Sequence, residues 1–135
     1  MVRNAKQSGR ADRVIVSAQC YFRRSTASVE ALSAKAVKGR TTPDGGMVLI
    51  FSETASFSAA DADIRQAKFE DAIAGHIDAM ESVGVTGEDF AENNGEISLS
   101  ISLCPVTGQA GIVLPPGLFS RLRDVPLSIY VDALR

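Results

Sequence analysis

The chain has 135 residues, 45% of them hydrophobic and 22% charged, which is the size and composition of one globular domain with its own core. No apolar run approaches the ~20 residues of a membrane-crossing helix, and the two cysteines lack the close spacing of a metal knuckle or a redox motif. We therefore expect a cytoplasmic protein in which residues 1–11 form a disordered basic tail and residues 12–135 fold as a single α+β domain.

The net charge of −2 conceals two parts of opposite sign. Residues 1–40 contain nine Lys or Arg and two Asp or Glu, a balance of +7. Residues 41–135 contain five and fourteen, a balance of −9, and most of the acids lie between residues 44 and 96. Such an asymmetry is informative about binding partners rather than about the fold.

The first part of the chain predicts two strands with an ambiguous segment between them. Residues 13–22 alternate apolar and polar side chains, as in a strand with one buried face. Residues 28–37 fit a helix, which we favour, but they would also suit a strand hairpinned to the first. Turn-forming residues at 41–46 then precede a buried strand over residues 47–53.

The strongest helical pattern covers residues 58–83. Ser58 and Asp61 resemble a capping box at its start, and Gly84 suits the left-handed position beyond its end. The apolar stripe that should face a sheet consists of Ile64, Phe69, Ala72, Ile73, Ile77 and Met80. Gly75 costs a helix interior about 1 kcal/mol relative to Ala, so we expect it to mark a close approach to the sheet.

Strict alternation of Ile or Leu with Ser over residues 96–104 predicts a half-buried strand, and residues 127–134 show a similar pattern. Between them we predict a hairpin turn at 105–108, a strand at 111–114 and a short helix from Pro116. The whole order predicts an α+β two-layer domain. Its mostly antiparallel sheet of about five strands is packed by the long helix and one or two short helices.

Residue types suited to catalysis are scarce. His76 is the only histidine, and Ala72 and Met80, one helical turn away on either side, cannot join it as metal ligands. We interpret it as a histidine on the helix surface or at the boundary of the apolar stripe, hydrogen-bonded to a neighbour. Cys20 and Cys104 are interpreted as buried free thiols, with a disulfide between neighbouring strands left open. We therefore expect a protein that is not an enzyme, with no catalytic residue, no metal and no cofactor.

Three surfaces are candidates for binding, although an ordinary solvated surface is the simpler explanation of each. The acidic face consists of Asp61, Asp63, Glu70, Asp71, Asp78, Glu81, Glu88, Asp89 and Glu92. A flat surface of small hydroxyl side chains consists of Ser98, Ser100 and Ser102, together with Tyr130 if the last strand pairs nearby. The candidate nucleic-acid contacts are Arg13, Arg23, Arg24, Lys35, Lys38 and Arg40.

Two segments carry a family resemblance: Gly-Ile-Val-Leu-Pro-Pro-Gly-Leu-Phe-Ser-Arg-Leu at 111–122 and Leu-Ser-Ile-Tyr-Val-Asp at 127–132. In these segments and in element order, residues 46–134 resemble the bacterial domain of unknown function number 4279. The family's Asp-x-Tyr ending is not matched, because position 128 is Ser. The resemblance implies a small α+β domain, an association with immunity proteins of toxin systems, and no catalytic residues.

These features favour a protein-binding domain of an immunity or inhibitory type, whose acidic face meets a basic partner such as a nuclease. A phage-encoded inhibitor that imitates nucleic-acid charge would use the same face. One alternative is a nucleic-acid-associated protein that uses the basic residues 1–40. Another is a small self-assembling structural protein, of the phage type, that associates through sheet edges or the serine surface. No membrane partner is expected.

Overall fold

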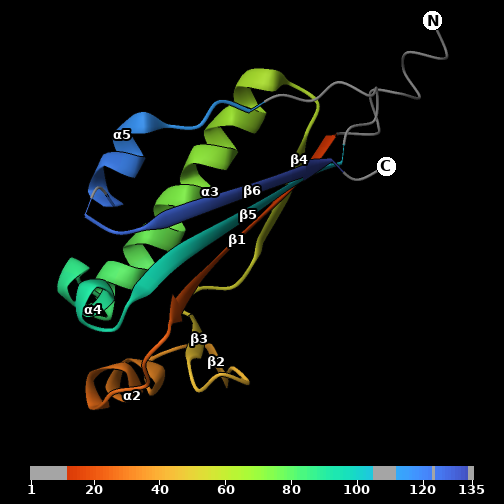
Figure 1. Cartoon of the computed structure of the whole chain (residues 1–135). Coiled ribbons are helices and arrows are strands. Elements are labelled where there is room, and N and C mark those ends of the chain that lie inside the picture. The colour runs from red at the N-terminus through yellow and green to blue at the C-terminus, as the bar shows by residue number, and fades with distance from the viewer. Residues whose placement is uncertain (1–11, 105–111, 123, 134–135) are drawn as a thin grey trace, which may run out of the picture.

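The alternating residues of the first strand place every second side chain in the core and make it the central strand of the sheet. The computed structural model describes residues 12–104, 112–122 and 124–133. Its elements, in chain order, are β1 (Asp12–Phe22), α2 (Ala27–Ser33), β2 (Lys38–Thr41), β3 (Met47–Ile50), β4 (Ala55–Ala59), α3 (Ala62–Ser82), α4 (Gly87–Glu92), β5 (Gly95–Cys104), α5 (Pro116–Phe119), η1 (Ser120–Leu122) and β6 (Leu127–Ala133) (Figure 1).

The sheet has the strand order β2-β3-β1-β5-β6, and β4 also pairs with β1. On one side β1 pairs with β5 from Arg13↔Cys104 to Phe22↔Gly95. On its other side β4 and β3 pair with successive parts of β1. These pairings and that of β2 with β3 are antiparallel, whereas β5 and β6 are parallel. The predicted class, an α+β domain with a mostly antiparallel sheet, is confirmed.

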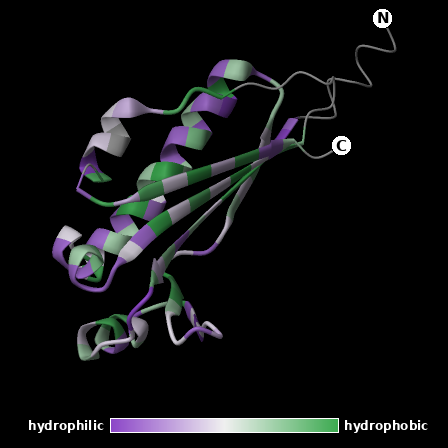
Figure 2. Ribbon diagram, viewed as in Figure 1, coloured by the Kyte–Doolittle hydropathy of each residue, from purple (hydrophilic) through white to green (hydrophobic). Residues whose placement is uncertain are grey.

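The core lies between one face of this sheet and α3 (Figure 1). Val29 and Leu32 of α2, Phe90 of α4 and Leu122 of η1 also belong to it. Figure 2 shows hydrophobic and hydrophilic residues alternating along β5 and β6. The largest side chains that are fully buried are Phe22, Leu49, Phe69, Ile73, Ile77, Ile97, Leu99 and Ile101. Because alternate strand residues point to opposite faces, the other face of β1, β5 and β6 remains outside the core.

The long helix begins later than the sequence pattern suggests. Asp61 is its N-cap. The Asp61 carboxylate accepts hydrogen bonds from the backbone N–H groups of Asp63 and Ile64, at 2.9 and 3.0 Å. Ser58 instead belongs to β4, where it pairs with Arg13, so the predicted start at residue 58 was wrong. Gly84 has φ +83° and follows the predicted helix end. The expectation for Gly75 was also wrong, because nothing lies within 4 Å of the position its Cβ would take.

Several other element bounds and one strand direction differ from those predicted. The segment 28–37 divides between α2 and the approach to β2, and the strand predicted at 47–53 ends at Ile50. The predicted hairpin turn at 105–108 lies outside the described residues, and residues 112–115 form no strand. We expected β6 to join an antiparallel sheet, but it runs parallel to β5 because the chain crosses over through α5 before it returns.

The predicted tail at residues 1–11 also lies outside the described residues. Within the part of the chain that is described, no helix combines the length and apolar character that crossing a membrane requires.

Candidate functional site

Two members of the predicted acidic face serve as helix caps. Asp61 caps α3, and Asp89 forms a capping box with Thr86 at the start of α4. In that box the Asp89 carboxylate accepts the Thr86 backbone N–H at 2.8 Å, and the Thr86 hydroxyl accepts the Asp89 backbone N–H at 3.3 Å. A carboxylate in this position satisfies N–H groups that the helix leaves unpaired. The sequence position of both acids therefore has a local structural reason.

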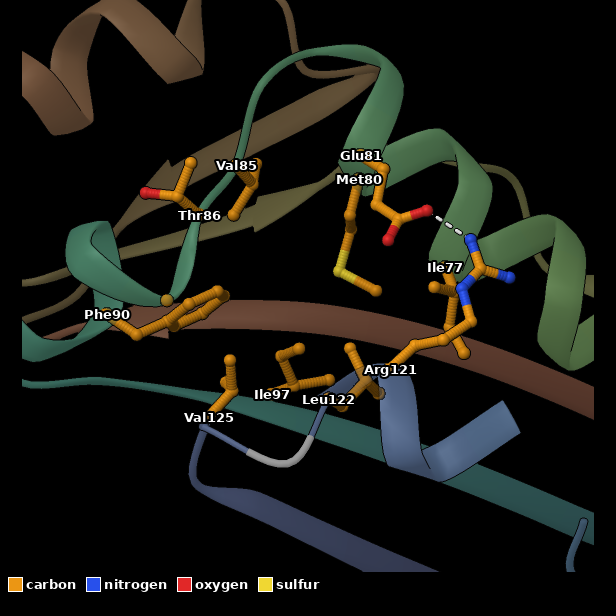
Figure 3. Close-up of a pocket in the computed structure, with 11 residues that line it drawn as sticks. Ile77, Met80, Glu81, Val85, Thr86, Phe90, Ile97, Arg121, Leu122 and Val125 are labelled. Carbon is orange, nitrogen blue, oxygen red and sulfur yellow. Dashed lines mark hydrogen bonds and ion pairs between the residues drawn. The ribbon is translucent and has the colours of Figure 1, made fainter. Parts of the chain in front are cut away.

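Two further acids bind a cation from a distant part of the chain. The guanidinium of Arg121, in η1, donates to Asp78 at 2.7 Å. It also donates to Glu81, a contact that Figure 3 shows. These contacts raise the pKa of Arg121, and the hydrogen bond to Asp78 has the larger effect, ahead of that to Glu81. This pair of contacts joins α3 to the segment that leads into β6. Sequence reasoning missed it, because Arg121 follows Glu81 by 40 residues.

A small cavity lies beside this ion pair, between the end of α3, α4 and η1 (Figure 3). Met80, Phe90, Ile97 and Leu122 are among its apolar lining residues, and their side chains point toward one another. Its volume is about 70 Å³. Ligand pockets usually exceed ~300 Å³, so this cavity has the size of a packing gap that one or two waters would fill.

Five acids remain, which we call the outer carboxylates: Asp63, Glu70, Asp71, Glu88 and Glu92. Within the described residues none of them forms an ion pair. All are exposed except Glu70, which is half-buried. A hydrogen bond with Glu88, and then the negative charge of Glu88, raise the pKa of Glu92. These two residues lie four apart on α4, where like charges repel.

The cations near the outer carboxylates do not neutralise them. Arg65 points into the protein, where it bonds to the Ala59 carbonyl at 3.1 Å and to Asp12 at 3.3 Å. Its side chain is only 7% exposed. Lys68 is then the one exposed cation of α3 and α4. The outer surface of these two helices is therefore predominantly negative.

The four residues of the predicted flat surface share one face of the sheet. Ser98, Ser100 and Ser102 are half-buried on β5, on the side away from the core. The parallel register places Tyr130 beside Ser100, and Tyr130 is 61% exposed. Ser100, Ser102 and Tyr130, together with Asp132, border a shallow hollow over β5 and β6. The structure thus brings the predicted residues together on a surface that is open and nearly uncharged.

The predicted nucleic-acid contacts do not form one set. Arg13 lies at the start of β1 and donates to the Ser56 hydroxyl at 2.9 Å. Arg23 follows the other end of β1, about 33 Å away at the usual rise of ~3.3 Å per residue. The remaining cations, Arg24, Lys35, Lys38 and Arg40, belong to α2, β2 and the segments beside them, at that second end. Lys38 and Arg40 border a hollow of about 100 Å³ over β3.

His76 is buried, at 3% exposed, rather than on the surface of α3 or at the boundary of its apolar stripe. Its Nε2 lies 3.1 Å from the carbonyl oxygen of Val16, and its Nδ1 is hydrogen-bonded to the Ser52 hydroxyl. Because a carbonyl can only accept, Nε2 carries the proton and Nδ1 accepts from Ser52. Burial lowers the pKa of His76, which favours the neutral ring. Both nitrogens are therefore engaged within the protein.

Both cysteines are free, and Cys20 is buried as predicted, whereas Cys104 is only half-buried. They lie on the paired strands β1 and β5, but Cys20 is opposite Ile97 and Cys104 is opposite Arg13. Burial raises the pKa of Cys20 to about 12, so its thiol stays protonated near neutral pH. The described residues contain no group of three or more His, Cys, Asp or Glu that could hold a metal ion.

Asn93 is a buried polar residue that sequence reasoning missed. Its side-chain amide donates to the Asp89 carbonyl at 2.8 Å and its side-chain oxygen accepts from the Thr26 hydroxyl at 2.6 Å. The residue is 1% exposed, and it connects α4 with the start of α2. Its sequence neighbours Asn94 and Gly95 indicate a turn, and no local pattern shows that the first of the two asparagines is buried.

Comparison of the chain with models of known protein families, with curated proteins and with solved structures finds no match.

Proposed function

We propose that this chain is a non-enzymatic protein-binding domain whose outer carboxylates meet a basic surface on a partner protein. The observation that carries the proposal is the unbalanced charge of α3 and α4. Within the described residues the five outer carboxylates have no ion pair, and Lys68 is the only exposed cation of the two helices. A surface of one sign attracts a partner of the other sign and accelerates their encounter.

The Glu88–Glu92 pair supports the same function. Two like charges at this helical spacing destabilise a free helix. The pKa of Glu92 is raised first by a hydrogen bond with Glu88 and then by the negative charge of Glu88. A cation of a partner protein placed between the two carboxylates would remove the repulsion. The inhibitory or immunity type of the proposal rests on the resemblance of residues 46–134 to the bacterial domain number 4279.

The test compares two double charge reversals that change the net charge equally. Asp71→Lys with Glu92→Lys alters the outer carboxylates, whereas Glu30→Lys with Glu53→Lys alters exposed acids elsewhere. Asp78 and Glu81 are left unchanged because they hold Arg121. Each protein is immobilised, incubated with lysate of the source cell, and eluted with salt, and the retained proteins are identified by mass spectrometry.

We expect the wild type and the Glu30/Glu53 variant to retain the same basic protein and to release it at high salt. The Asp71/Glu92 variant should lose it, and titration of the purified pair should show a dissociation constant at least about tenfold higher. Equal retention by both double variants would overturn the proposal, as would capture of no basic protein by the wild type.

A second candidate function is nucleic-acid binding. It is supported by the position of Arg23, Arg24, Lys38 and Arg40 at the same end of β1. Phosphate contacts require such a group of cations. The combined substitution Arg23→Ala and Arg40→Ala should then abolish retention of RNA or DNA at low salt. No retention by the wild type would exclude this function.

A further inference from the structure

The edge strands on the two sides of the described sheet differ in the side chains that they expose. On one side β2 exposes all four of its residues, including Lys38 and Arg40, and β4 exposes Ser56 and Ser58. Charged side chains on an edge strand deter pairing with another chain. On the other side β6 exposes Tyr130 by 61% and Val131 by 54%. Asp132 is the only charged residue of β6, so this edge has less of that protection than β2.

The register shows which backbone groups of β6 face this edge. The N–H of Ile97 donates to the carbonyl of Pro126 at 2.8 Å, and in a parallel pair alternate residues of each strand bond to the same neighbour. Ser128, Tyr130 and Asp132 therefore direct their backbone groups toward β5. Leu127, Ile129, Val131 and Ala133 direct theirs away from it. Among the described strands none pairs with these outward groups.

We propose that β6 pairs antiparallel with β6 of a second copy of this chain, about a two-fold axis that passes beside Tyr130. In this register Tyr130 lies opposite Tyr130 of the second copy, on the face that carries the serine surface. Ile129 lies opposite Val131 of the second copy, with their outward backbone groups exchanging hydrogen bonds. The two sheets become one, with both α3 helices on the same side.

The sequence of β6 is complementary to itself in this register, which is why the occupant is a second copy. Apolar Ile129 meets apolar Val131, the Ser128 hydroxyl meets the Asp132 carboxylate, and the two tyrosines stack across the axis. No like charges are opposed. The register also pairs all residues of the strand, whereas moving the axis to Ile129 or Val131 leaves two residues of each β6 unpaired within it.

A charge swap at Tyr130 tests the proposal, because this residue is its own partner across the axis. Sedimentation velocity should show that the wild type is a dimer at about 100 μM, a concentration at which micromolar association is visible. Tyr130→Lys and Tyr130→Glu should each weaken the dimer about tenfold or more by opposing like charges. An equal mixture of the two variants should dimerise again. Val37→Lys and Val37→Glu, at a similarly exposed apolar residue outside β6, should remain dimeric.

A monomeric wild type overturns the proposal, and so does a dimer that neither Tyr130 substitution weakens. A mixture that stays monomeric also overturns it, because opposite charges must attract in this register. Open-ended assemblies would exclude a two-fold contact, which closes on itself.

If circular dichroism shows that a charged variant does not fold, Val131→Pro replaces it. The N–H of Val131 faces the edge, so the pairing with β5 should survive while the dimer is lost. A folded Val131→Pro variant that dimerises like the wild type would likewise contradict the proposal.

Discussion

The Nε2 atom of His76 donates a hydrogen bond to the carbonyl oxygen of Val16, 3.1 Å away. This contact joins the long helix α3 to the central strand β1 inside the core, where His76 is 3% exposed. Ser52 completes the arrangement from the segment after β3. Three elements that are distant in the sequence are thus connected through one imidazole ring.

Acid should destabilise the fold through His76. Burial lowers the pKa of the folded-state ring below its ordinary value of 6.5, so below that pH the unfolded chain binds a proton that the folded chain does not. The free energy of unfolding therefore falls as the pH decreases from 6.5 to the folded-state pKa, by at most about 1.4 kcal/mol per pH unit. Urea unfolding at a series of pH values should show this slope in the wild type and a smaller slope in His76→Gln. Equal slopes would contradict the assignment.

Gly75→Ala should stabilise the protein by about 1 kcal/mol. The position lies inside α3, is exposed, and has open space where the Cβ would lie. Alanine loses less backbone entropy than glycine when a helix forms. Thermal unfolding followed by circular dichroism would measure the gain. A loss of stability would mean that Gly75 has a contact that the open space does not suggest.

Gly95→Ala should have the opposite effect. A Cβ on Gly95 would lie 2.7 Å from the ring of Phe22 and 2.9 Å from that of Phe90, and these two rings stack with centroids 5.1 Å apart. Neither ring can move without disturbing the other, so the overpacking should cost about 1–3 kcal/mol. The same thermal unfolding experiment measures the change, with Gly75→Ala as the matched glycine substitution.

Cys20 should react with a thiol reagent only after unfolding. Its pKa of about 12 leaves almost no thiolate near neutral pH, it is 1% exposed, and its Sγ lies 3.4 Å from the Sδ of Met80. In a Cys104→Ser background, labelling with an aromatic disulfide reagent should be slow in buffer and fast in urea. Rapid labelling of the folded protein would show that the first strand opens readily.

Asn93→Leu should cost about 1–3 kcal/mol of stability. The substitution removes the hydrogen bonds that the Asn93 side chain makes with the Thr26 hydroxyl and with the Asp89 carbonyl, and each such bond contributes about 0.5–1.5 kcal/mol. Hydrogen exchange should also accelerate in α2, which Asn93 joins to α4. Asn94→Gly is the control: Asn94 is exposed and has φ +53°, which glycine adopts without strain. Similar losses in both variants would argue against a specific role for Asn93.

The faces of the main elements could be predicted from the sequence. The Ser alternation assigned the inner and outer sides of β5, and the apolar stripe from Phe69 to Met80 assigned the buried side of α3, because both depend only on the periodicity of one element. Ile64 was wrongly included in that stripe, since it is 54% exposed in the first turn of the helix. The start of α3 was harder to predict. Ser58 and Asp61 are both good caps, and only the pairing of Ser58 with Arg13 in β4 excludes the first.

Direction and distant contacts could not be predicted in the same way. Alternation indicates which residues of β6 share a face but not whether the strand runs parallel to its neighbour, which depends on the crossover through α5. The paired and unpaired members of the acidic face could not be told apart for a similar reason. Asp78 and Glu81 resemble Asp71 in sequence, and only the position of Arg121 distinguishes them. Asn93 was missed because burial depends on α2, far away in the chain.

The position of β1 has a consequence for synthesis of the chain on the ribosome. Phe22 pairs with Gly95, and Arg13 pairs with Cys104. The backbone groups on one side of β1 therefore stay unpaired until β5, which is synthesised much later, has been made. Until then β1 can complete only its pairings with β3 and β4. Contacts between such distant residues slow folding and prolong the exposure of unpaired strands. The nascent chain therefore acquires its central sheet late, when most of its residues have already left the ribosome.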